Sequence, residues 1–112
     1  MAYNEILAQR VRELLAQQPE VFEKNMFGGL CFMVSDKMCL CVNETELMCR
    51  VGPSVYEAAL EQPGCREMTF TGRSMKGYVF VDESVLKARK ALAYWIGLCL
   101  AYNPEAKASK KK

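Results

Sequence analysis

The residues best suited to bind a ligand are three cations and a glycine. Arg50 ends an apolar run just before Gly52-Pro53, which is a typical start of a helix. The free N–H groups at the start of a helix attract anions. Arg73 and Lys76 lie in the polar segment 72–77, which we expect to be a loop. If the fold brings this loop beside Gly52, the three cations and Gly52 form a site for a small, nucleotide-like anion.

The same cations also have a structural interpretation. Arg50 then pairs with a glutamate, and Arg73 and Lys76 are solvated loop residues. The sequence leaves both interpretations open.

The chain contains no histidine, and this limits its chemistry. Histidine is the commonest general base and a common metal ligand, so Ser-His-Asp and Cys-His arrangements are excluded. Chemistry based on lysine or carboxylates remains possible in principle. Because no catalytic set can be assembled, the sequence favours a non-enzymatic function. An enzyme acting on nucleotides or RNA is less expected than either a protein-interaction module or a domain that binds a small anion.

Six cysteines are a second candidate for chemistry, and they are Cys31, Cys39, Cys41, Cys49, Cys65 and Cys99. The C-x-x-C spacing of zinc sites does not occur, so we expect no metal and no cofactor. The N-terminal segment lacks the pattern of an export signal, and the cytosol keeps thiols reduced. We therefore expect reduced, buried thiols in a cytoplasmic protein.

Cys39 and Cys41 should point to one face of a strand, because side chains alternate along it. The position of Cys31 depends on the register of the predicted hairpin. A two-residue turn at Ser35-Asp36 places Cys31 on the opposite face, whereas a three-residue loop at 36–38 places all three thiols together.

The Gly28-Gly29 pair lacks the context of a phosphate-binding loop. Glycine most often allows a positive φ or a close approach of backbones. We expect Gly28 and Gly29 to form a turn or bulge, and Gly72 and Gly77 to be structural as well.

Hydrophobic periodicity predicts the elements that hold these residues. Helices are expected at 3–17, with Asn4 as N-cap, at 53–62, and from 82–84 to 102; strands are expected at 30–34, 38–42, 47–51, 67–71 and 78–81. The order is α-β-β-β-α-β-β-α. Runs of strands with short turns predict an α+β fold of two layers, in which helices pack on a mainly antiparallel sheet.

The chain of 112 residues fits one domain, which we place at 1–104, and a flexible basic tail at 105–112. The tail holds Lys107, Lys110, Lys111 and Lys112, which leaves residues 1–106 with 11 basic and 13 acidic residues. Because residues 1–106 are slightly acidic, we do not expect the chain to bind DNA directly. No apolar run is long enough to cross a membrane.

The predicted hairpin is apolar on both faces. If helices cover only one side of the sheet, an apolar surface remains, and such surfaces often mark an interface. We therefore expect a protein partner, most simply a second copy of the chain.

Three ordered motifs carry a family resemblance. They are Met26-Phe27-Gly28-Gly29-Leu30, Leu47-Met48-Cys49-Arg50-Val51-Gly52-Pro53 and Phe70-Thr71-Gly72-Arg73-Ser74-Met75-Lys76-Gly77-Tyr78-Val79. Over roughly residues 5–103, the chain resembles the N-terminal domain family of the TfoX/Sxy competence regulators of bacteria.

The resemblance implies a fold like that of the secretion chaperones and a tight two-residue turn at Ser35-Asp36. It also implies a regulatory role in competence, which the better-known members perform with a second, helical domain and a cyclic-AMP receptor protein. Since the chain ends at Lys112, we expect a stand-alone member that lacks the second domain. The family supplies no catalytic residues, so the expected function is a non-enzymatic regulatory or protein-interaction module.

Overall fold

The computed structural model describes residues 3–26, 29–70 and 73–106. Its helices are α1 (Glu5–Leu14), α2 (Tyr56–Leu60), α3 (Glu83–Leu86) and α4 (Arg89–Tyr102), with short 3₁₀ turns η1 (Pro53–Val55) and η2 (Asn103–Glu105). Its strands are β1 (Val21–Met26), β2 (Gly29–Val34), β3 (Lys37–Val42), β4 (Glu46–Arg50), β5 (Cys65–Phe70) and β6 (Arg73–Asp82).

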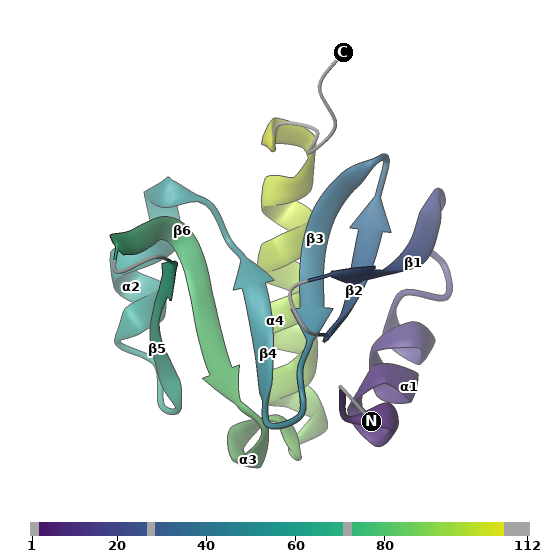
Figure 1. Ribbon diagram of the computed structural model, residues 1–112, viewed down its shortest axis with the longest axis horizontal. Helices are drawn as coiled ribbons and strands as arrows, with labels where there is room; N and C mark the ends of the chain where they lie inside the picture. The colour runs from purple at the N-terminus through teal and green to yellow at the C-terminus, as the bar shows by residue number, and fades with distance from the viewer. Residues whose placement is uncertain (1–2, 27–28, 71–72, 107–112) are drawn as a thin grey trace.

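The strands form one sheet in the order β1-β2-β3-β4-β6-β5, and every neighbouring pair is antiparallel. Helix α4 runs along one face of this sheet against β3 and β4, with α1 and α2 on either side of it (Figure 1). The predicted α+β fold with a mainly antiparallel sheet and packed helices is therefore confirmed.

Local capping explains where α1 begins. Asn4 has an extended backbone, and its side-chain oxygen accepts a hydrogen bond from Leu7 N over 3.0 Å, as an N-cap does. Its side-chain nitrogen donates to Glu83 Oε1 over 2.7 Å, so the same residue ties α1 to the start of α3. The predicted N-cap at Asn4 is confirmed.

Two clusters of buried side chains lie on opposite faces of the sheet. The first lies between the sheet and the helices, and α4 contributes Leu92, Trp95, Ile96 and Cys99 to it, as predicted. The second occupies the other face and consists of Cys31, Met33, Met38, Cys41, Met48 and Met68, with Tyr78 and Phe80 packed against it. Its six members are at most 6% exposed, so the open apolar sheet face that we expected is not found at these positions.

The structure differs from the predicted elements mainly in three places, and the helix predicted at 53–62 is divided into η1 and α2. Strand β1 was not predicted, and it supplies one edge of the sheet. The final helix is divided into α3 and α4. Strand β6 begins at Arg73, so Arg73 and Lys76 belong to a strand and not to the expected loop.

A β-bulge at Cys39 decides how the cysteines are distributed. Met33 pairs with Met38 beyond a two-residue turn, but Phe32 pairs with Leu40, which leaves Cys39 as an extra residue in β3. Cys39 therefore packs in the first cluster and Cys41 in the second, and the prediction that they share a face is wrong.

The same register places Cys31 directly opposite Cys41, and these two residues form a disulfide. The expectation that all cysteines are reduced is wrong for this pair. The four free cysteines are Cys39, Cys49, Cys65 and Cys99. None of the described helices has the length and apolar character needed to cross a membrane.

Candidate functional site

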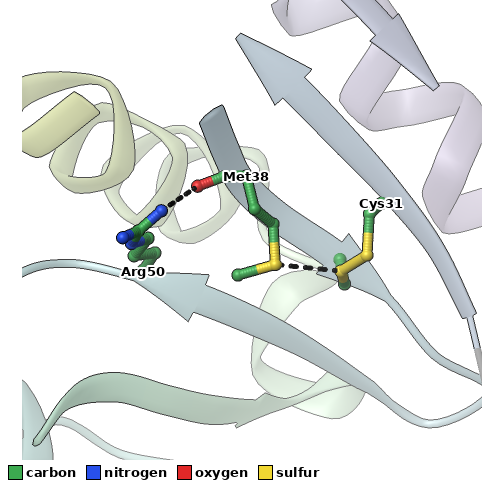
Figure 2. The surroundings of a disulfide bond; sticks show 4 residues. Cys31, Met38 and Arg50 are labelled. Carbon is green, nitrogen blue, oxygen red and sulfur yellow. Dashed lines mark hydrogen bonds between the residues drawn. A yellow bond between two sulfur atoms is a disulfide. The ribbon is translucent and has the colours of Figure 1, made fainter. Parts of the chain in front are cut away.

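Arg50 lies at the end of β4, where its guanidinium is held by a carbonyl and two aromatic rings. Nη1 donates a hydrogen bond to the carbonyl oxygen of Met38 over 3.3 Å (Figure 2). The centre of the guanidinium lies 5.5 Å from the ring of Tyr78 and 6.0 Å from the ring of Tyr102, which is a cation–π arrangement. The half-buried Arg50 thus joins β3, β6 and α4 at one end of the sheet.

Arg50 is not paired with a carboxylate among the residues that the structure describes. The ion pairs there join Arg12 to Glu23 and Arg66 to Glu46. Arg50 Nε is buried and has no hydrogen-bond partner in the described part of the chain. The structural alternative, in which a glutamate neutralises Arg50, is therefore not seen.

Gly52 and Gly77 bring the start of η1 against β6. Gly77 O accepts hydrogen bonds from Val51 N over 2.8 Å and from Gly52 N over 3.0 Å. A Cβ on Gly52 would collide with the ring of Tyr102, and Gly52 has a φ of +91°. The segment before Tyr78 thus does lie beside Gly52, but the Gly52 N–H already has a partner within the fold.

The other candidate residues are placed as follows. Lys76 is exposed on β6, one residue before Gly77. Arg73 pairs with Phe70 through its backbone at the start of β6, and its side chain lies outside the described atoms. A Cβ on Gly29 would collide with the carbonyl oxygen of Val42. Gly28 and Gly72 lie outside the described residues.

Three of the four free thiols are poor nucleophiles and poor metal ligands. The pKa of Cys39 is raised well above its usual value by a hydrogen bond with Cys99 and by burial, and burial likewise raises the pKa of Cys99. Burial raises the pKa of Cys65 to about 11. Since the thiolate is the reactive form, these three residues are protonated and unreactive at neutral pH. No metal-binding cluster of Cys, Asp or Glu occurs in the described part of the chain.

Sequence reasoning missed a second candidate surface, which we name the α4 outer face. It consists of the exposed residues Ala93, Tyr94, Gly97 and Ala101. Tyr94 is 46% exposed, and a Cβ on Gly97 would meet no atom within 4 Å. The signal in the sequence is the segment 91–102, which contains no charged residue although half of the helix faces solvent.

Two hollows lie beside the α4 outer face, one near each end of α4. The first has a volume of about 320 Å³ and is lined by Gln62, Pro63, Val85, Lys90, Ala91, Tyr94 and Trp95. The second has a volume of about 210 Å³ and is lined by Val51, Ser54, Val55, Leu98, Ala101, Tyr102 and Glu105. The α4 residues in both sets recur every three or four positions, so both hollows border the same side of the helix.

Among the described residues of the α4 outer face and the two hollows, the charged ones lie at the two ends. Lys90 lines the first hollow, and Glu105 lines the second. Lys37 Nζ donates to the carbonyl oxygens of Asn103 over 3.2 Å and Pro104 over 3.3 Å, and thereby caps the C-terminal end of α4. The helix is thus fixed to the sheet at the end where Glu105 lies.

Comparison with known proteins identifies the family. A search of curated proteins and a search of solved structures each found no match. A scan against protein families matches residues 13–102 to the TfoX N-terminal domain. This segment covers most of the 112 residues and includes both the Arg50 site and α4. The chain belongs to the TfoX N-terminal domain family.

Proposed function

We propose that this TfoX N-terminal domain is a non-enzymatic, regulatory protein-interaction module that binds its partner through the α4 outer face. The observation that carries the proposal is the exposed half of α4, which has no charged residue between Lys90 and Glu105. A helix at the surface of a protein normally presents charged and polar residues to solvent.

The chemistry of this surface suits a protein interface. The centre of an interface is depleted in charged residues, and tyrosine is enriched among the residues that dominate binding energy. Tyr94 projects from this uncharged region one turn after Lys90, and the adjoining hollows offer space for side chains of a partner. Burial of this surface would remove apolar area from water without breaking any ion pair of the described chain.

Affinity capture from bacterial lysate tests the proposal. Gly97→Arg places a long, charged side chain in the centre of the α4 outer face, where the monomer has open space. Phe22→Glu is the matched control, because Phe22 is 49% exposed on β1 and pairs with Met33 of the second cluster, on the other face of the sheet. We expect a partner that is captured by the wild type and by Phe22→Glu and is lost with Gly97→Arg. Capture that is unchanged by Gly97→Arg would refute the proposal.

A second function, binding of a small anion, is supported by Arg50. Its Nε has no hydrogen-bond partner and its charge is not neutralised by a described carboxylate, so an anion could satisfy both. Lys76 is an exposed cation on β6, the strand that neighbours β4. Millimolar sulfate or ATP should then raise the midpoint of thermal unfolding by a few degrees, and Arg50→Lys should abolish the effect. The absence of any shift for the wild type would remove this function.

The finer role in the regulation of bacterial competence, and a cytoplasmic location, are proposals that rest on family membership. Deletion of the coding sequence should change the frequency of natural transformation, and fractionation should recover the protein with cytoplasmic markers. An unchanged frequency would argue against the role in competence.

A further inference from the structure

We propose that the partner of the α4 outer face is a second copy of this chain, with α4 packed antiparallel against α4 of the second copy. The inference rests on the proposed function, because it names the occupant of the same surface. An interface of this kind has two-fold symmetry, so each contact occurs twice and the surface must be complementary to itself.

The charges at the two ends of the surface meet this requirement. Lys90 lies near the start of α4, and Glu105 lies 15 positions later in η2, directly after the helix; each lines one of the two hollows that border the same side of α4. In an antiparallel pair centred near Gly97, Lys90 of each copy lies beside Glu105 of the other. A parallel pair would bring Lys90 against Lys90 and Glu105 against Glu105, which is repulsive. The charges therefore select the antiparallel orientation.

The shapes of the side chains agree with the same arrangement. In the antiparallel pair, Tyr94 of one copy faces Ala101 of the other. Ala101 lines the second hollow together with Leu98 and Tyr102, so a large ring meets a small residue beside a hollow of about 210 Å³. Gly97 lies near the two-fold axis. The absence of a side chain there allows the two helix axes to approach to about 8–10 Å, the usual distance between packed helices.

A dimer of standard size would bury only a small share of the surface of this chain. A standard interface takes about 800 Å² from each partner, which is roughly an eighth of the 6621 Å² that this chain exposes. The α4 outer face and the rims of the two hollows extend along the whole helix. We expect a dissociation constant on the order of ten micromolar, because a small interface without buried ion pairs gives modest affinity.

Sedimentation equilibrium of the purified full chain tests the inference, with a charge exchange as its central comparison. Lys90→Glu places like charges together at both symmetric contacts, and so does Glu105→Lys. We expect each single variant to weaken the dimer about tenfold. The double variant Lys90→Glu/Glu105→Lys restores opposite charges and should return to within about threefold of the wild type. Circular dichroism should show the same fold for all four proteins.

The outcomes separate the inference from the proposed function. A wild type that is monomeric up to about 200 µM overturns the second copy as partner. The proposed function then survives if Gly97→Arg still abolishes capture of another protein. The antiparallel α4 interface is overturned if the double variant does not restore the dimer, or if Gly97→Arg still forms it. Phe22→Glu is the control and should leave dimerisation unchanged.

Discussion

Cys31 and Cys41 lie directly opposite each other in β2 and β3 and form a disulfide, ten positions apart in the chain. The other four cysteines are free. Thiol titration of the denatured, unreduced protein should therefore find four reactive groups among the six cysteines. Cys31→Ser should raise the count by one, because Cys41 is then free as well. A wild-type count of six would contradict the pairing.

Reduction of this disulfide should lower the stability of the chain. A closed loop of this size restricts the unfolded state, and loop-closure entropy predicts a loss of about 2–3 kcal/mol in the free energy of unfolding. Urea unfolding with and without a reductant measures the loss. The variant Cys31→Ser controls for other thiols, because reductant should not change its stability further.

Gly52→Ala should destabilise the fold severely. The backbone at Gly52 has a φ of +91°, and the added methyl group would collide with the ring of Tyr102. We expect a loss of about 2–4 kcal/mol in the free energy of unfolding. Tyr102→Ala/Gly52→Ala removes the collision, but it keeps the backbone strain and loses the contact of Tyr102 with Arg50, so it should remain less stable than the wild type in urea unfolding.

Gly97→Ala should have the opposite effect. Gly97 lies inside α4, and a Cβ there meets no atom within 4 Å. Alanine is favoured over glycine in a helix, so the monomer should gain about 0.5–1 kcal/mol. A loss of stability measured at low protein concentration would show that the outside of α4 is not open.

Asn4→Ala should cost about 1 kcal/mol, since α1 loses its N-cap. Asn4→Asp is the informative comparison. Aspartate can accept the hydrogen bond from Leu7 N, but it cannot donate to Glu83 and brings two carboxylates together. We therefore expect Asn4→Asp to be less stable than the wild type at neutral pH, as urea unfolding of the two proteins would measure.

The ion pair of Arg12 and Glu23 should make a small, pH-dependent contribution. The hydrogen bond from Arg12 lowers the pKa of Glu23 below 4.5 in the folded state. The ionised form is thus favoured by folding, and its stabilisation is present above the unfolded pKa and lost as the pH falls through the folded one. Both side chains are about one-third exposed, so Glu23→Gln should cost about 0.5 kcal/mol at pH near 7 and nothing at pH about 2.

The sequence pattern was sufficient for the fold class, but not for the details of the sheet. Helix α4 was predicted because its inward residues repeat with the helical period. Strand β1 was missed because an edge strand can carry polar residues on both faces, as Glu23, Lys24 and Asn25 do here. The bulge at Cys39 was missed because one extra residue in a strand leaves no mark on the apolar pattern and yet turns every preceding side chain to the other face.

The candidate site was predicted only in part. The approach of Gly77 to Gly52 follows from pairing of β4 with β6, which local sequence signals do not specify. Which strand neighbours β4 depends on the global packing of the sheet. The α4 outer face was visible in the sequence as an uncharged segment, but its exposure depends on which side of α4 contacts β3 and β4.

Cross-linking through an engineered cysteine tests most directly whether the α4 outer face binds a second copy. In a Cys65→Ser background, which removes the half-buried free thiol, Gly97→Cys places a thiol near the proposed two-fold axis. Mild oxidation should convert most of this variant to a covalent dimer with twice the mass of the 12.7 kDa chain, while Phe22→Cys should remain monomeric. Equal cross-linking of the two variants, or none in Gly97→Cys, would contradict the account.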